Sequence, residues 1–534
     1  MQGTRSEQWW RDAVVYQIYP RSFADADGNG VGDLAGATDR LPYVAGLGVQ
    51  AIWLTPFQRS PQADHGYDVS DYCDVDPLFG DLSSFDSLVR EAHDLGLRVL
   101  VDLVPNHASS AHPLFQAALG AEPGSPERAL FHFAPGRGPD GAEPPNNWTS
   151  VFGGPAWTRV TEPDGQPGEW YLHLYAPEQP DWNWRDPRVG PMFDDVVRFW
   201  FDRGADGLRI DVAHGLFKAA GLPDLETPAT AEPMRLRANP LACNQFEVHE
   251  VYRRWRRIAD GYERPRVLVG EANLPPADVA SYTRPDELHQ VFAFAFLAAP
   301  WDARAWLDAA VALLDVSAGT GASTTWVVEN HDVERVPTRY GGGARGRARA
   351  RAAILAVLGL PGAAYLYQGQ ELGLPEVDVP EDRRQDPAWV RNGVSRDGCR
   401  VPMPWMTEPV GTYGFSPEGA SEPWLPVPAG WGSRSVAAQA GDDGSVLALC
   451  RRALDVRAQL HRDGGLTADD RVSWQRTDDG RLVAERDGGF WLVLAMGDEA
   501  VPLPDGELLV ASAPLTPEGR LPADSAAWLR RPEG

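Results

Sequence analysis

Short apolar, β-branched runs alternate along this chain with segments of helical periodicity, and this alternation constrains the fold most strongly. Near-continuous apolar runs are typical of parallel strands that are buried on both faces. The segments between them carry apolar residues at helical spacing, as from Phe193 to Trp200, which is followed by Gly204. The apolar runs are 13–20, 49–56, 98–105, 207–213, 266–272, 289–296, 323–330 and 363–369. Eight strands that alternate with helices predict an α/β fold, a (β/α)8 TIM barrel.

Two regions interrupt this alternation. Residues 108–180 are too long for an ordinary loop and are rich in Pro, Gly and aromatic residues, so we expect an inserted lid domain (B domain) after strand 3. From residue 466 the pattern becomes alternating and turn-separated, which predicts a C-terminal antiparallel β domain, sandwich-like, over 466–534. The catalytic barrel would then comprise 1–107 and 181–465.

Composition excludes several classes of protein. The chain has 534 residues and a formal net charge of −26, which disfavours nucleic acid or an anionic membrane as partner. No apolar run approaches the roughly 20 residues of a membrane-spanning helix. The four cysteines lack CxxC spacing, and the first residues do not resemble a signal peptide. These features predict a cytoplasmic protein that acts on small molecules.

Three acidic residues, Asp211, Glu271 and Asp332, each sit at the end of a short apolar stretch that is predicted to be a strand. Carboxyl ends of parallel barrel strands meet at one mouth, where a set of carboxylates can cleave a glycosidic bond. Arg209 lies two residues before Asp211 on the same strand face, and a guanidinium there should lower the pKa of Asp211, as a nucleophile requires. Glu271 borders an apolar wall beside other carboxylates, so we expect a raised pKa and a general acid.

Four ordered motifs carry a resemblance that covers nearly the whole chain. DLVPNH (102–107), GLRIDVAH (207–214), GEAN (270–273) and VENHD (328–332) resemble the signature stretches of glycoside hydrolase family 13, the α-amylase family.

The resemblance implies roles for individual residues. By position, Asp211 resembles the family's nucleophile, Glu271 its acid/base, and Asp332 the third carboxylate, which binds sugar hydroxyls. Arg209, His107 and His331 match residues that line the subsite of the cleaved glucose. The implied reaction retains the anomeric configuration through a covalent β-glucosyl-aspartate, which requires the two carboxyl groups to lie about 5–5.5 Å apart.

Two further stretches of the sequence resemble segments of α-glucosidases. HGYDVSDY (65–72) and CRVPMPW (399–405) imply that Asp68 and Arg400 face the far hydroxyls of the terminal sugar. A charged pair there would close the pocket, so that only chain ends of α-glucosides enter.

QPDWN (179–183) resembles the QPDLN stretch of the oligo-1,6-glucosidase branch, with Trp182 where Leu is usual. Tyr67, Phe152 and Trp148 are candidates for stacking on sugar rings, although each could equally pack in a core.

The sequence leaves open which glycosidic linkage is cleaved and whether water or another hydroxyl accepts the glucosyl group. In relatives, Val at the position of Val212 accompanies α-1,6 cleavage, but the residues that follow it differ here. One alternative is a transglucosidase, or an enzyme acting on sucrose or trehalose, that uses the same intermediate. A remote alternative is a scaffold like the heavy subunits of amino-acid transporters, which are membrane-anchored and lack the carboxylates.

The segment DADGNGVGD (25–33) has the composition of a calcium loop. It matches the first nine positions of an EF-hand loop, although position twelve is Gly36 and not the bidentate Glu. It also resembles the single-ion loop near the N-terminus of bacterial α-glucosidases. We therefore expect a structural Ca2+ whose ligands are Asp25, Asp27, Asn29, the Val31 carbonyl and Asp33.

Overall fold

The computed structural model describes residues 8–226 and 236–531, and its central feature is a closed barrel of eight parallel strands. The order is β11-β10-β9-β5-β2-β1-β13-β12, and a parallel bridge between Phe292 and Thr325 joins the two ends. Each predicted apolar run contains one strand, so the barrel prediction is confirmed. The strands are β1 Val14–Ile18, β2 Ala51–Leu54, β5 Arg98–Leu103, β9 Gly207–Ile210, β10 Val267–Gly270, β11 Gln290–Val291, β12 Thr325–Trp326 and β13 Ala363–Tyr367.

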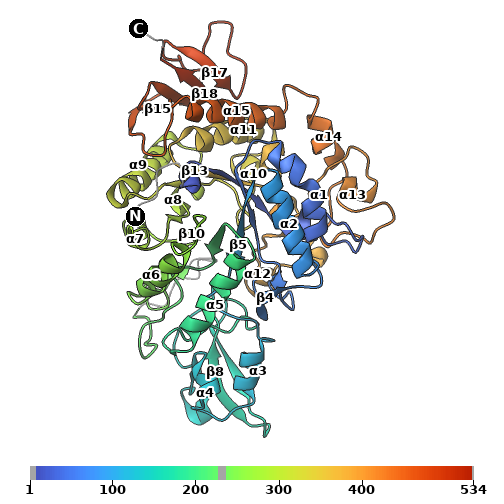
Figure 1. The fold of residues 1–534 in the computed structure, drawn as a ribbon, viewed down its shortest axis with the longest axis vertical. Helices are drawn as coiled ribbons and strands as arrows, with labels where there is room; N and C mark the ends of the chain where they lie inside the picture. The colour runs from blue at the N-terminus through green and yellow to red at the C-terminus, as the bar shows by residue number, and fades with distance from the viewer. Residues whose placement is uncertain (1–7, 227–235, 532–534) are drawn as a thin grey trace.

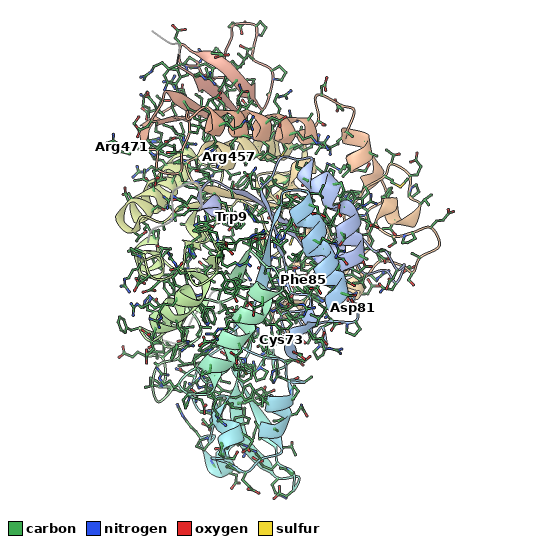
Figure 2. All side chains as sticks on the ribbon, viewed as in Figure 1. Trp9, Cys73, Asp81, Phe85, Arg457 and Arg471 are labelled. Atoms are coloured by element: carbon green, nitrogen blue, oxygen red, sulfur yellow. The ribbon has the colours of Figure 1, made fainter. Side chains whose placement is uncertain are left out.

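Amphipathic helices surround the barrel (Figure 1). In α2, the Asp81 side chain accepts the Ser84 N–H at the N-terminus, and Phe85 is buried against the barrel (Figure 2). The helices between strands are α1 Leu34–Ala45, α2 Leu82–Asp94, α5 Val189–Asp202, α6 Val248–Ala259, α7 Pro276–Tyr282, α8 Phe294–Leu297, α9 Ala303–Thr320, α10 Val336–Arg339 and α11 Gly343–Gly359. After β13 come α12 Pro387–Asn392, α13 Gly411–Gly414, α14 Val436–Gln439 and α15 Val446–Arg462.

The insertion between β5 and α5 forms a small lid. Its three-stranded antiparallel sheet has the order β6-β8-β7, and it projects with α3 and α4 from one end of the molecule (Figure 1). The elements are α3 Pro113–Leu119, α4 Pro126–Ala129, β6 Phe133–Ala134, β7 Trp157–Thr161 and β8 Pro167–Leu172. A hairpin of β3 Gln58–Arg59 and β4 Asp71–Val75 follows β2.

One buried lysine fastens the lid to the barrel. Lys218 Nζ lies 2.7 Å from Asp181 Oδ2 and 2.8 Å from Asn106 Oδ1, and it also donates to the Gly215 carbonyl. Asn106 precedes the lid, Asp181 follows it, and Gly215 lies four residues after Asp211. Lys218 and Asp181 are both fully buried, so this ion pair fixes both ends of the lid relative to the β9 loop.

The chain ends in an antiparallel sheet of order β14-β15-β16-β18-β17, located beside α11 and α15 at the other end of the molecule (Figure 1). Trp528 of β18 is buried on α11, where its Nε1 donates to the Leu355 carbonyl at 3.0 Å. The second face carries an apolar cluster around Val493 that includes Val501 and Leu521 from the connecting loops. Within the described residues this is one sheet, packed on helices and loops and not on a second sheet as in a sandwich. Its strands are β14 Val472–Arg476, β15 Arg481–Arg486, β16 Phe490–Ala495, β17 Glu507–Ala511 and β18 Ser525–Arg530.

Among the described helices, none combines the length and the apolar character that crossing a bilayer requires.

Candidate active site

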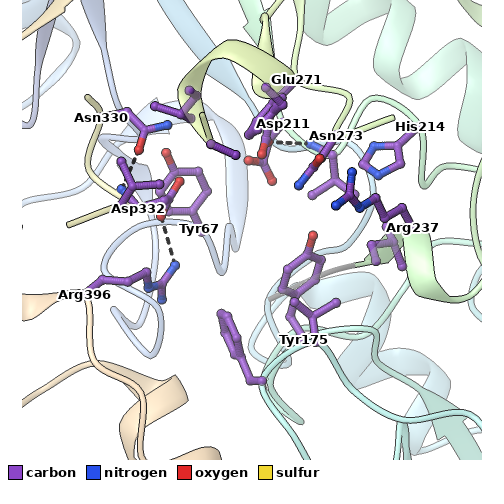
Figure 3. Close-up of a pocket in the computed structure, with 18 of the residues that line it drawn as sticks. Tyr67, Tyr175, Asp211, His214, Arg237, Glu271, Asn273, Asn330, Asp332 and Arg396 are labelled. Carbon is purple, nitrogen blue, oxygen red and sulfur yellow. Dashed lines mark hydrogen bonds and ion pairs between the residues drawn. The ribbon is translucent and has the colours of Figure 1, made fainter. Parts of the chain in front are cut away.

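A cavity of about 520 Å³ opens at the carboxyl ends of the barrel strands. Its wall is built from the loops that follow the strands, together with Val151, Phe152 and Tyr175 of the lid (Figure 3). Among the predicted site residues, those that line it are Tyr67, His107, Phe152, Asp211, Glu271 and Asp332.

Arg209 lies beneath the cavity and binds three carboxyl groups. Its Nη1 is 2.7 Å from Asp211 Oδ1 and 3.0 Å from Asp102 Oδ1, and its Nη2 is 2.8 Å from Glu271 Oε2. In the sheet, Arg209 of β9 is in register with Asp102 of β5, so both side chains point into the barrel. The guanidinium carbon lies 5.0 Å from the centre of the Trp53 ring, which forms part of the apolar barrel interior.

The pKa values differ from the expectation for Asp211. Burial and the adjacent Glu271 raise the pKa of Asp211 well above its ordinary value, although Arg209 opposes this shift. Burial also raises the pKa of Asp102 to about 7. Arg209 lowers the pKa of Asp211 as expected, but the prediction of a net lowered pKa is wrong, because burial and Glu271 outweigh a guanidinium that also binds Asp102 and Glu271.

Val212 adopts a conformation that is rare for a β-branched residue, with φ at +45°. In this conformation its N–H donates to Glu271 Oε2 at 3.0 Å. Val212 thus orients the Glu271 carboxyl group through its N–H. The strained backbone at Val212 lies next to both Asp211 and Glu271.

A buried hydrogen-bonded chain runs below Asp332. Gln17 Nε2 lies 2.7 Å from His331 Nδ1, His331 Nε2 lies 2.7 Å from the Tyr67 hydroxyl, and that hydroxyl lies 3.2 Å from Asp102 Oδ2. Since the Gln17 amide donates to Nδ1, the ring proton of His331 is on Nε2. Burial lowers the pKa of His331 to about 3, so the imidazole is neutral.

His107, Phe152 and Trp148 have different environments. His107 donates through Nε2 to the Tyr67 carbonyl at 3.0 Å, and burial lowers its pKa to about 3. The Arg396 guanidinium carbon lies 5.0 Å from the centre of the Phe152 ring. Trp148 belongs to the core of the lid, where its Nε1 donates to the Pro223 carbonyl, and it does not line the cavity.

Asp332 contacts two arginines. Its Oδ1 accepts from Arg400 Nη2 at 2.9 Å and from Arg396 Nη1 at 3.1 Å. Burial alone would raise the pKa of Asp332, but His331, Arg396 and Arg400 together hold it below the ordinary value. Asp332 is therefore an ionised acceptor at neutral pH.

The charged pair at this end of the cavity is not the predicted one. Asp68 and Arg400 are completely buried behind the wall: Asp68 accepts from Ser60 and from the N–H groups of Ala63 and Asp64, and Arg400 Nε donates to the His331 carbonyl.

The residues that reach the cavity are Asp64 and Arg396, each four positions before the predicted residue and just outside the quoted segment, with Arg396 Nη2 3.0 Å from Asp64 Oδ1. The placement of Asp68 and Arg400 against the substrate is thus corrected. A loop residue can point toward or away from a cavity, and the sequence spacing alone does not distinguish the two.

Other lining residues were missed by the sequence analysis. His214, Asn273 and Asn330 lie within the quoted motifs, which could have indicated them. Tyr175 and Arg237 lie in long loops without a local signal.

The acidic loop near the N-terminus gathers oxygen atoms. Side-chain oxygens of Asp25, Asp27 and Asp33 lie within 4.8 Å of one another. The loop is held by its own backbone: Gly28 and Gly30 donate to Asp25 at 2.7 and 2.9 Å, and Gly36 donates to Asp33. Asn29 Oδ1 accepts the Val31 N–H. Three clustered carboxylates are hard oxygen donors of the type that Ca2+ prefers.

Comparisons with known proteins identify the family. The model of the α-amylase catalytic domain matches residues 17–463. A probable α-glucosidase of Rhizobium meliloti is 39% identical over 471 residues, covering 84% of this chain and 82% of that protein. An oligo-1,6-glucosidase of Parageobacillus thermoglucosidasius is 34% identical over 493 residues, covering 84% of each chain.

Among solved structures, an α-glucosyl transfer enzyme superposes with a TM-score of 0.88 at 36% identity, over 98% of this chain and 99% of that one. The chain belongs to the α-amylase family, glycoside hydrolase family 13, and is a glycoside hydrolase of its α-glucosidase branch.

Proposed function

We propose that this glycoside hydrolase is an exo-acting, retaining α-glucosidase that removes terminal glucose from short α-glucosides. The observation that carries the proposal is a cavity with Asp211 and Glu271, both bound by Arg209, in its wall and the Asp64–Arg396 ion pair at one end.

The chemistry follows from the carboxyl pair. Asp211 attacks the anomeric carbon while Glu271 gives its proton to the leaving oxygen, and the glycosidic bond breaks to leave a β-glucosyl ester on Asp211. Water then attacks the same carbon, its proton passes to Glu271, and the ester bond to Asp211 breaks. Arg209 binds both carboxyl groups and limits the negative charge that accumulates during the cycle.

Selection of chain ends follows from the Asp64–Arg396 pair. A terminal glucose presents free hydroxyls to a carboxylate and a guanidinium, whereas an internal residue would have to place its next sugar where these side chains lie. Asp332 is an ionised acceptor for further hydroxyls of the same ring.

Product analysis tests this proposal directly. The purified protein is incubated with maltose, isomaltose, sucrose and trehalose, and with maltotriose whose non-reducing end is blocked. We expect glucose from at least one disaccharide, no cleavage of the blocked trisaccharide, and α-glucose as the first anomer by NMR. Cleavage of the blocked substrate contradicts exo action, and initial β-glucose contradicts retention.

A transglucosidase is the second candidate, because the solved structure with a TM-score of 0.88 is that of an α-glucosyl transfer enzyme. In that reaction a sugar or alcohol hydroxyl, in place of water, attacks the glucosyl ester on Asp211. The same incubations distinguish the two, since transfer yields longer products at the expense of free glucose as the acceptor concentration rises.

We also propose that Ca2+ binds the loop of Asp25, Asp27, Asn29, Val31 and Asp33 as a structural ion. The clustered carboxylates support this. EDTA should lower the midpoint of thermal unfolding, excess Ca2+ should restore it, and Asp25→Ala should abolish the difference. Identical unfolding curves of the wild type with EDTA and with Ca2+ contradict the proposal.

A further inference from the structure

The cavity has two chemically distinct ends on either side of Asp211 and Glu271 (Figure 3). One end carries Asn330, Asp332 and Arg396, with Asp64. The opposite end carries His214, Arg237 and Asn273, with apolar surface from Val212 and Leu236. In the proposed reaction Glu271 protonates the leaving oxygen, so the glucose occupies the Asp64–Arg396 end. The leaving group then occupies the end around Arg237, which is called the aglycone end below.

Arg237 differs from Arg209 and Arg396 in its partners. Arg209 binds Asp102, Asp211 and Glu271, and Arg396 binds Asp64, Asp332 and Asp386. Arg237 lies in the short helical turn Leu236–Ala238 and lines the cavity, yet it forms no ion pair or hydrogen bond with any residue in 8–226 or 236–531. Its guanidinium is therefore available to a substrate.

The neighbours of Arg237 add hydrogen-bonding capacity without neutralising its charge. Burial lowers the pKa of His214 to about 4, so this imidazole is neutral at pH 7. Asn273 lines the same end, two residues after Glu271, and its side-chain amide makes no hydrogen bond within the described part of the chain. Within 8–226 and 236–531, the aglycone end thus presents one positive charge without an ion-pair partner and one amide without a hydrogen bond, in a protein whose net charge is −26.

A planar guanidinium binds carboxylate or phosphate oxygens through two parallel N–H groups, and a neighbouring amide can donate a third hydrogen bond. We propose that Arg237 and Asn273 form a specificity site for α-glucosides whose leaving group carries an anionic oxygen substituent, a carboxylate or a phosphate. The proposal depends on the proposed function, because the assignment of the aglycone end assumes that Glu271 protonates the leaving oxygen.

Paired substrates that differ in charge alone test the site. The first pair is 4-carboxyphenyl and 4-carbamoylphenyl α-glucoside, and the second is maltose phosphorylated on its reducing-end glucose against maltose. For each pair the charge preference is the ratio of kcat/KM for the anionic member to that for the neutral member. We expect a ratio of at least about 5 for one pair, falling as salt is added. The pair that shows the ratio distinguishes a carboxylate from a phosphate.

The variants are Arg237→Gln, Arg237→Lys and, as a matched control, Arg471→Gln, just before β14 of the distant C-terminal sheet (Figure 2). Arg237→Gln should lower the charge preference to about 1 or below, Arg237→Lys should keep part of it, and Arg471→Gln should keep all of it. Equal ratios in the wild type and Arg237→Gln for both pairs would overturn the inference. Failure of the proposed function gives a different result: the wild-type protein would then leave the neutral members of both pairs and 4-nitrophenyl α-glucoside uncleaved.

Discussion

Asp211 and Glu271 bind the two terminal nitrogens of a single guanidinium, at 2.7 Å from Arg209 Nη1 and 2.8 Å from Arg209 Nη2. Asp102 accepts from the same Nη1, so one positive charge serves three buried carboxyl groups. Burial and the neighbouring Glu271 raise the pKa of Asp211, and this shared guanidinium does not offset them.

Asp211→Asn should abolish turnover while leaving the protein folded. We expect kcat to fall by about 10⁴-fold or more, as for other residues that form part of the reacting set. The measurement is kcat on the best disaccharide, with circular dichroism as the folding control and Asp195→Asn, an exposed helix position, as the matched variant. A variant that turns over at the wild-type rate would remove Asp211 from the mechanism.

The same substitution should not destabilise the protein at neutral pH. The folded-state pKa of Asp211 lies above the unfolded value, so its contribution to stability is present below the unfolded pKa and is lost as pH rises through the folded pKa. Asn at position 211 does not ionise, so the variant does not lose stability as the pH rises. The midpoint of thermal unfolding at pH 7 should therefore stay the same or rise by about 1–2 °C. At pH 4 the difference should vanish. A lower midpoint at pH 7 contradicts the raised pKa.

Asp64 and Asp68 should respond differently to the same substitution. Asp64→Asn removes an ionised partner of Arg396 that lines the cavity, so kcat/KM should fall by about 10-fold or more with little change in unfolding. Asp68→Asn alters a fully buried acceptor of backbone N–H groups, so it should lower the unfolding midpoint and leave the activity of the folded fraction close to normal. The opposite pattern would restore the assignment made from the sequence.

The pH profile should identify Asp64 as well. Burial raises the pKa of Asp64 to about 6, although Arg396 and Arg400 oppose this. If binding uses the ionised carboxylate, kcat/KM falls as pH drops through about 6, and this acidic limb is missing in Asp64→Asn. If Asp64→Asn keeps the same fall in kcat/KM at acidic pH, another group, such as Asp102, is responsible for that fall.

The sequence predicted the barrel and the three carboxylates because both depend on strands. A buried parallel strand needs an apolar run, and the residue that follows the strand reaches the mouth of the barrel, as Asp211 after β9 and Glu271 after β10 do. Loops follow no such rule, so the sequence does not show that Asp64 lines the cavity whereas Asp68 is buried behind its wall. The sequence also did not predict that Arg209 binds Asp102 as well as Asp211. Asp102 is more than 100 residues from Arg209 along the chain, and the two side chains meet because β5 and β9 pair in register.

Lys218→Met should destabilise the protein strongly, because it leaves the carboxylate of Asp181 buried without its partner. We expect a loss of about 3–5 kcal/mol in the free energy of unfolding, measured in urea. Adding Asp181→Asn to this variant should recover part of the loss, since the remaining buried charge disappears. If the double variant is less stable than Lys218→Met, the lysine and aspartate do not act as a pair.

Asp64 follows β2 and Arg396 follows β13, whereas His214 and Arg237 follow β9 and Asn273 follows β10. Recognition of the sugar and recognition of its substituent are thus encoded in separate stretches of the gene. Exchange of the β9 loop between homologues could change the range of natural glycosides processed without rebuilding the apparatus that holds glucose. Divergence within this branch can therefore proceed one loop at a time.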